Sequence, residues 1–104
     1  MALRVVLVED EAFIRRGLRQ MLERAPGLAV VGEAADGWPA VHLCRQVRPD
    51  LVLMDLHLPG LSGFEAIRLL TRESPPIRCL AMSSVCYAEW VIAAFKAGAR
   101  GFLP

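Results

Sequence analysis

The chain has 104 residues, 55% of them hydrophobic and 22% charged, which is enough for one hydrophobic core and too apolar for a disordered segment. The formal net charge of +1 leaves no excess of basic residues, so this segment is a poor nucleic-acid binder by itself. The cysteines Cys44, Cys79 and Cys86 lack the spacing of a disulfide framework or a zinc site, and no apolar run could cross a bilayer. We therefore expect one domain, residues 1–104, in the reducing cytoplasm and without membrane contact.

Five short apolar runs rich in valine, leucine and isoleucine predict strands. They are Leu3–Val8, Leu28–Val31, Leu51–Met54, Ile77–Met82 and Gly101–Leu103. The runs are nearly continuous rather than alternating, and this pattern is typical of a parallel sheet that is covered on both faces.

The segments between these runs have the apolar spacing of amphipathic helices. In the first segment, the apolar stripe consists of Phe13, Ile14, Leu18, Met21 and Leu22. The solvated face of the same helix is expected to carry Arg15, Arg16, Arg19 and Arg24.

The second helix is predicted to begin near Asp36, with Pro39 in its first turn, and to end before Pro49. The third is predicted to follow Ser62 and Gly63.

The fourth helix is predicted from Tyr87 to Ala97, and Gly98 is placed to end it. Its buried face is expected to comprise Trp90, Val91, Ala94 and Phe95. Strands and helices thus alternate along the whole chain, which predicts an α/β fold with a doubly wound parallel sheet and right-handed crossovers.

Oxygen-bearing side chains follow three of the predicted strands. Glu9 and Asp10 come after the first strand, Asp55 after the third, and Ser83 and Ser84 after the fourth. Because the functional crevice of an open parallel sheet lies at the carboxyl ends of its strands, we expect these side chains to converge there.

Two carboxylates on neighbouring strands about 5 Å apart would repel by about 3 kcal/mol at an effective dielectric of about 20. A hard divalent cation would relieve this repulsion, and Mg²⁺ in particular binds one or two carboxylates together with phosphate oxygens. Beside such an ion, Asp55 at the end of a buried strand could attack phosphorus and form an aspartyl phosphate.

Four sequence strings resemble motifs of a known family. The strings VLVEDE, DLVLMDLHLPGLSG, CLAMSS and AGARGFLP resemble, in order and spacing, the receiver domain of bacterial response regulators over essentially the whole chain. The third string and the GARGFL ending are most similar to the NarL/FixJ (LuxR-type) branch. The resemblance implies a flavodoxin-like five-stranded sheet in the order 2-1-3-4-5, and a signalling domain that is no enzyme beyond its own phosphorylation and dephosphorylation.

The resemblance also implies roles for individual residues. Asp55 corresponds to the phosphoacceptor, which takes its phosphoryl group from a histidine kinase. Glu9 and Asp10 correspond to the acidic pair that holds Mg²⁺ together with Asp55, and the backbone carbonyl of His57 to a further metal ligand.

Two further positions correspond to the family's switch. Ser83 matches the hydroxyl residue that hydrogen-bonds the phosphoryl group, and Ser84 is the adjacent, less favoured hydroxyl. Phe102 matches the aromatic residue that changes rotamer when the hydroxyl shifts.

The sequence departs from the family pattern in two respects. Glu9 stands where many members have Asp, so its longer side chain could reach the metal through a water. The chain stops at Pro104, one residue short of the family's lysine and its last helix, and Lys96 in the fourth helix cannot replace that lysine.

We therefore expect the 104 residues to be part of a longer or shortened regulator, with weakened coupling between Asp55 and Ser83. The missing helix would leave an apolar strip bare beside the first and fifth strands, and a second copy of the chain is expected to cover it as a homodimer. DNA binding would require a domain outside this chain.

The sequence also bears on three other interpretations. A phosphatase of the haloacid dehalogenase kind needs a second Asp two residues after the nucleophile, where this chain has His57. A flavodoxin-like cofactor module needs a Gly-rich phosphate loop, and acidic residues occupy that place. A phosphorylation-impaired, receiver-like interaction module stays open, and phosphate-analogue binding with Mg²⁺ would distinguish it.

Overall fold

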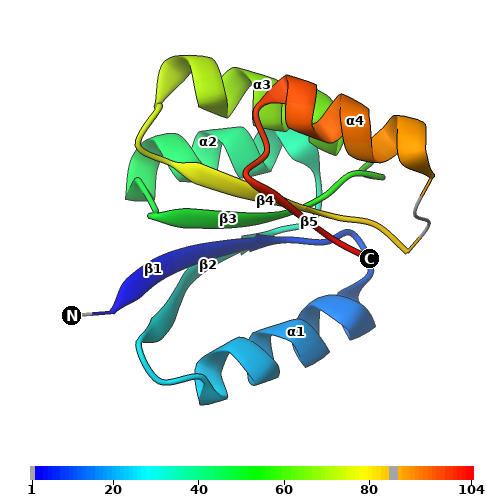
Figure 1. Ribbon diagram of the computed structural model, residues 1–104. Helices are drawn as coiled ribbons and strands as arrows, with labels where there is room; N and C mark the ends of the chain where they lie inside the picture. Colours follow the sequence, from blue (N-terminus) through cyan, green and yellow to red (C-terminus); the bar gives the residue numbers. More distant parts are fainter. Residues whose placement is uncertain (1, 85–86) are drawn as a thin grey trace.

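The computed structural model describes residues 2–84 and 87–104, so Cys86 lies outside the described part of the chain. One sheet of parallel strands has the order β2-β1-β3-β4-β5 (Figure 1). Its strands are β1 (Leu3–Val8), β2 (Leu28–Ala34), β3 (Leu51–Asp55), β4 (Arg78–Met82) and β5 (Gly101–Leu103). This arrangement confirms the predicted flavodoxin-like doubly wound sheet.

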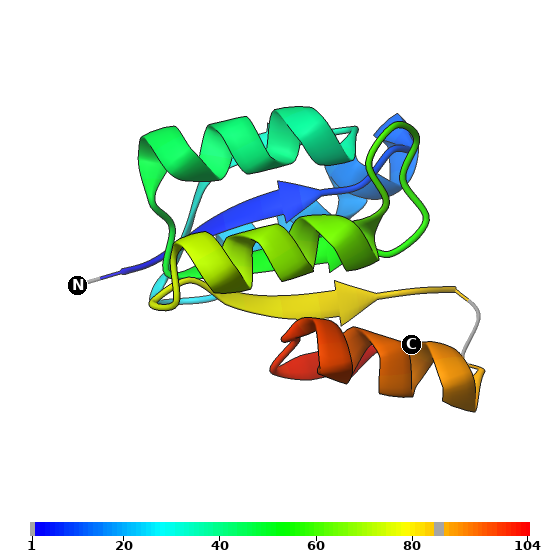
Figure 2. The same cartoon turned by 90° about the horizontal axis from the view of Figure 1, so that it is seen from above.

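The helices divide unequally between the two faces of the sheet. They are α1 (Ala12–Arg24), α2 (Gly37–Val47), α3 (Gly63–Glu73) and α4 (Ala88–Ala97). Helix α1 lies alone on one face, whereas α2, α3 and α4 lie side by side on the other (Figures 1 and 2). None of the described helices has the length and apolar character needed to cross a membrane.

The hydrophobic core follows this division. A large cluster lies between the sheet and the three helices α2, α3 and α4. A small cluster of Val5, Leu7 and Leu53 lies on the α1 face, where Leu18 and Leu22 of α1 are only partly buried against it. One helix cannot cover a five-stranded sheet, so the α1 face is the more exposed of the two.

The predicted apolar stripe of α1 is wider than the face that the helix buries. Phe13 is 86% exposed and Met21 is 68% exposed, and Ile14 is half-exposed. The stripe prediction was therefore wrong for Phe13 and Met21. Helix α1 packs through Leu18 and Leu22, and side chains that flank this narrow contact remain in solvent.

Helix α4 shows a similar difference between expectation and structure. Ala94 and Ala97 are buried, but Phe95, which was expected in the core, is 48% exposed. The helix is apolar on more than one side, so its spacing did not identify the packed face. The small alanine side chains allow α4 to approach its neighbours, and this close packing determines the face.

Strand β2 continues to Ala34, three residues beyond the predicted Val31. Gly32 and Glu33 are not apolar, yet both remain paired with β1 after a register shift between Val5 and Val6. The hydrophobic pattern could not predict this extension, because it depends on the neighbouring strand.

Apolar side chains are exposed between α1 and β5, on the face of the sheet that carries α1. Ile14 of α1 and Leu103 of β5 are each 44% exposed. Leu18, Leu80 and Met82 lie partly buried beside the small core on this face.

Candidate functional site

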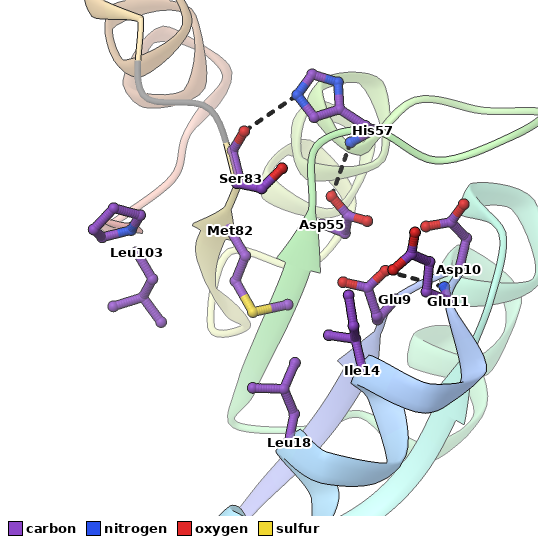
Figure 3. A pocket seen from close by; sticks show the side chains of 12 residues that line it. Glu9, Asp10, Glu11, Ile14, Leu18, Asp55, His57, Met82, Ser83 and Leu103 are labelled. Carbon is purple, nitrogen blue, oxygen red and sulfur yellow. Dashed lines mark hydrogen bonds between the residues drawn. The ribbon is translucent and has the colours of Figure 1, made fainter.

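The predicted oxygen-bearing residues converge at the carboxyl ends of β1, β3 and β4. A cleft of about 530 Å³ opens there, and Glu9, Asp10, Asp55, His57 and Ser83 are among the residues that line it (Figure 3). Ser84 also lines the cleft, but its side chain is exposed whereas Ser83 is buried.

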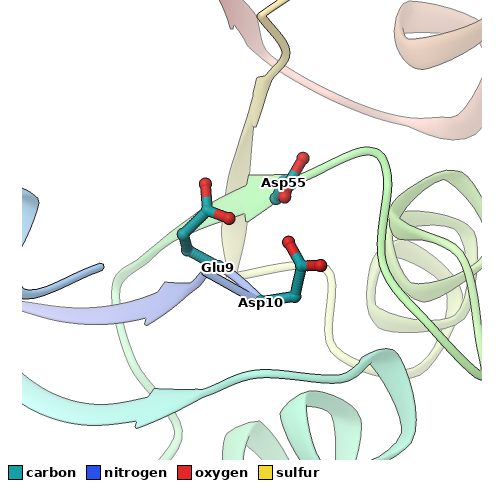
Figure 4. Close-up of side chains that lie close together, drawn as sticks. All are labelled: Glu9, Asp10 and Asp55. Carbon is teal, nitrogen blue, oxygen red and sulfur yellow. The ribbon is translucent and has the colours of Figure 1, made fainter. Parts of the chain in front are cut away.

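Three carboxylates form the centre of this cleft. Glu9, Asp10 and Asp55 each present an oxygen such that all three oxygens lie within 4.8 Å of one another (Figure 4). Glu9 and Asp55 are buried, at 8% exposure each, and Asp10 is exposed. Buried carboxylates without a positive partner are costly, so the cluster differs from an ordinary solvated acidic surface.

Backbone hydrogen bonds fix Glu9 just after β1. Its N–H donates to the carbonyl of Ala34 at 3.0 Å, which continues the ladder between β1 and β2. Its Oε2 accepts from the N–H of Glu11 at 3.1 Å, and its carbonyl accepts from Nη1 of Arg15 at 2.7 Å. The first turn of α1 therefore orients this carboxylate toward the cleft.

Asp55 is the last residue of β3, paired with Met82 of β4. Its Oδ1 accepts from the N–H of His57 at 3.0 Å, and the loop then turns back so that Gly63 donates to Leu56 at 3.1 Å. A Cβ atom on Gly63 would lie 2.0 Å from the carbonyl oxygen of Asp55, so the start of α3 packs directly against the backbone of the site. A glycine is required at this contact.

The other side of the same loop is held by α2. The side chain of Asp36 caps this helix by accepting from the N–H of Trp38. A Cβ atom on Gly37 would lie 1.9 Å from the carbonyl oxygen of Leu61, so the first turn of α2 touches the loop backbone. The loop that carries His57 is thus held between two helix starts.

The electrostatics of the cluster favour a cation. The pKa of Glu9 is raised to about 7, mainly by burial and also by the neighbouring carboxyl groups of Asp10 and Asp55, while the hydrogen bond from the N–H of Glu11 opposes the shift. Burial also raises the pKa of Asp55, although the N–H of His57 opposes this shift. Both shifts disfavour the charged carboxylates, and a bound cation would oppose these shifts.

The donor set fits a hard divalent ion such as Mg²⁺. All three side chains offer carboxylate oxygens, which are the ligands that Mg²⁺ prefers, and one of them remains open to solvent. Glu9, Asp10 and Asp55 would hold the ion, and the cleft has room for the phosphate oxygens that usually complete such a site.

The imidazole of His57 is part of the site in a way that the sequence did not predict. Its Nε2 shares a 3.2 Å hydrogen bond with the hydroxyl of Ser83, and its ring lies 4.6 Å from the indole of Trp90. Sequence reasoning assigned His57 only a backbone carbonyl. No local spacing could have indicated the ring contact, since the three residues come from different elements.

Phe102 is not brought into the cleft. It lies opposite Ala81 in the β4–β5 pairing and is partly buried against the large core, whereas the neighbouring Leu103 and Pro104 line the cleft. Its predicted switch role is not tested by this position. Lys96, in the last turn of α4, is exposed and lies outside the residues that line the cleft.

Known proteins resemble this chain over nearly its whole length. The family profile described as "Response regulator receiver domain" matches residues 5–104. The chain is 36% identical to the nitrate/nitrite response regulator protein NarL of Escherichia coli K12, over 95% of this chain and 46% of that protein. It is 41% identical to a protein-glutamate methylesterase/protein-glutamine glutaminase of Alkalilimnicola ehrlichii, over 100% of this chain and 27% of that protein.

A solved structure is similarly close. The crystal structure of a LuxR-family two-component response regulator from Aurantimonas sp. SI85-9A1 superposes with a TM-score of 0.93 and 41% identity, over 98% of this chain and 73% of that one. The chain spans less than half the length of the two curated relatives, which share a receiver but differ in overall function. Since the profile covers nearly the whole chain, the chain belongs to the response regulator receiver domain family.

Proposed function

We propose that this receiver domain accepts a phosphoryl group on Asp55 in a Mg²⁺-dependent reaction and thereby signals to an output. The observation that carries the proposal is the cluster of Glu9, Asp10 and Asp55, whose oxygens lie within 4.8 Å at the carboxyl rim of the sheet. Asp55 is buried at the end of β3, where a nucleophile can be held in one orientation.

The chain's own groups account for most of the reaction. Glu9, Asp10 and Asp55 would hold the metal, with the carbonyl of His57 as a further ligand. When bound, Mg²⁺ supplies the positive charge that lets one anion approach another. The N–H of His57 holds one oxygen of Asp55 in place at 3.0 Å, which restricts the rotation of the carboxylate.

The phosphoryl donor in this proposal is a phosphohistidine of a histidine kinase. An Asp55 oxygen attacks phosphorus, a P–O bond forms, and the P–N bond breaks, leaving its electron pair on the kinase imidazole, which takes up a proton. Ser83 then hydrogen-bonds the phosphoryl group, and Phe102 changes its packing. The position of Ser83 in the same cleft supports its part in this scheme.

The output is proposed to be transcription through a DNA-binding domain outside this chain. Resemblance to NarL and to the LuxR-family regulator favours that output. The methylesterase relative shares the receiver sequence but has a different overall activity. A receiver by itself is therefore compatible with a transcriptional output or with an enzymatic one.

One alternative is a receiver-like interaction module with impaired phosphorylation. The position of Lys96 favours it, because this lysine is exposed on α4 rather than beside the carboxylates. A lysine that contacts the phosphoryl group would stabilise the developing charge, and no lysine is among the described residues that line the cleft.

Incubation with acetyl phosphate and Mg²⁺, followed by intact-mass measurement, separates these functions. We expect the wild type to gain the mass of one phosphoryl group, and Asp55→Ala to gain none. Asp50→Ala is the matched control, because Asp50 immediately precedes β3 at the opposite end of the sheet. An unmodified wild type under conditions that saturate Mg²⁺ would favour the interaction module.

We further propose that a second copy of the chain covers the strip between α1 and β5, where Ile14 and Leu103 are exposed beside the small core. Sedimentation velocity over a range of concentrations should show a monomer–dimer equilibrium. Leu103→Glu should shift it to monomer, whereas Phe13→Glu, on the exposed side of α1, should not. A wild type that stays monomeric at the highest concentration would contradict this arrangement.

A further inference from the structure

His57 contacts three functional parts of the molecule at once. Its backbone N–H donates to Oδ1 of Asp55 at 3.0 Å, and its Nε2 lies 3.2 Å from the hydroxyl of Ser83 (Figure 3). Its ring packs at 4.6 Å, tilted by 56°, against the indole of Trp90 in α4. A single residue therefore joins the end of β3, the end of β4 and a helix of the covering layer.

The aromatic contact extends along α4. The ring of Tyr87, the residue before the helix, meets Trp90 edge-on, with centroids 4.9 Å apart and planes at 88°. Ring pairs in these tilted and edge-on arrangements attract each other in addition to the effect of buried area. The imidazole thus ends a short series of packed rings that begins at Tyr87, just before α4.

We infer that the imidazole of His57 is a positioning residue that couples the hydroxyl of Ser83 to helix α4 through the indole of Trp90. The inference builds on the proposed function, in which Ser83 responds to the phosphoryl group on Asp55. It adds a route to α4 that bypasses Phe102, which is partly buried against the large core and does not line the cleft.

The physical basis is the directionality of the hydrogen bond. A serine hydroxyl that turns toward a phosphoryl oxygen changes its distance and angle to Nε2 of His57, and a hydrogen bond weakens steeply with misalignment. The ring must then follow the hydroxyl or lose the bond. Because the indole lies in contact with that ring, either response alters the packing of Trp90.

Fluorine NMR of protein labelled with 5-fluorotryptophan measures this coupling directly. The chain has two tryptophans, and Trp38→Phe assigns the two resonances because Trp38 lies on α2, half-exposed. The variants are His57→Ala, Ser83→Ala and their combination. His42→Ala is the matched control, since His42 is exposed on α2.

The first arm uses the protein without phosphoryl group or mimic. Ser83→Ala should shift the Trp90 resonance in the wild-type background and leave it unmoved in the His57→Ala background, while the Trp38 resonance stays constant. This non-additivity is the signature of transmission through the imidazole. A Trp90 resonance that ignores Ser83→Ala, or that shifts equally in both backgrounds, would overturn the inference.

The second arm adds Mg²⁺ and beryllofluoride as a phosphoryl mimic. The wild type and His42→Ala should show a Trp90 shift, and His57→Ala should lose it while its thermal unfolding stays cooperative. Intact-mass measurement with acetyl phosphate reports on Asp55 separately. If Asp55 takes no phosphoryl group but the first arm shows non-additivity, the proposed function fails and the coupling stands. A full Trp90 response in His57→Ala would refute the coupling and leave the function intact.

Discussion

Charged side chains behave in opposite ways at the site and at a surface ion pair. On the surface, Glu73 of α3 pairs with Arg45 of α2 through two hydrogen bonds, and this partner lowers the pKa of Glu73. In the cleft, burial raises the pKa of Glu9 and of Asp55. A lowered pKa thus marks a carboxylate that is paired with a cationic side chain of the protein. A raised pKa marks a buried carboxylate whose charge would be stabilised by a bound cation.

This contrast explains why the two regions have different roles. A matched pair such as Arg45 and Glu73 links two helices and is complete without a ligand. The buried carboxylates at the carboxyl rim destabilise the folded protein when they are charged and no cation is bound. The same carboxylates are available to bind a cation. Perturbed carboxylates in a cleft are typical of functional sites for this reason.

The largest expected effect is on metal affinity. Asp10→Asn should weaken Mg²⁺ binding by about a hundredfold, because it removes the negative charge of one of the three carboxylates that would attract the divalent ion. Isothermal titration calorimetry would measure the change. Glu73→Gln, the same neutralisation at the matched pair, should leave Mg²⁺ binding unaltered, and comparable losses in both variants would contradict the contrast.

The next effect is on the pH dependence of stability without metal. The pKa of Glu9 rises from 4.5 to about 7, so the folded protein keeps a proton that the unfolded chain releases within this window. The free energy of unfolding should therefore fall by up to about 3 kcal/mol as the pH rises from about 4.5 to 7. The raised pKa of Asp55 should also lower the free energy of unfolding as the pH rises.

Urea unfolding at several pH values would test this prediction. Glu9→Gln should flatten the decline, and Mg²⁺ should restore stability above pH 7 in the wild type because it binds only the folded cluster. A free energy of unfolding that rises steadily over this pH range would contradict the prediction. It would show that cationic groups of the protein already stabilise these carboxylates.

The smallest effect is expected at the ion pair itself. The pKa of Glu73 is lowered, so the stability that its charge contributes is present at neutral pH and is lost as the pH falls through that lowered value. Because the pair is solvent-exposed, Glu73→Gln should change the melting temperature less than Glu9→Gln does, and in the opposite direction. Differential scanning calorimetry at pH 8 without metal measures both variants.

Much of the site was predictable because its residues stand at strand ends. The apolar runs place Glu9, Asp10, Asp55 and Ser83 directly after strands, and parallel topology brings those ends to one rim. Two helix ends could also be predicted: Ser62 caps the start of α3, and Gly98 ends α4 with a φ of 120°.

The packing of helices was less predictable. Phe13 was predicted on the apolar stripe of its helix and Phe95 on a buried face, yet both are exposed, because these apolar patterns are wider than the contacts the helices make. The contact between His57 and Trp90 was missed, because it joins residues that are far apart in the sequence.

By itself, then, the sequence determined the α/β alternation and the acidic rim, since both depend on residue type and on the position of each residue relative to its own strand. Only the tertiary structure decided which face of α1 and α4 is buried, how far β2 extends and what the imidazole of His57 touches. These features depend on contacts between elements, whose geometry no local pattern along the chain contains.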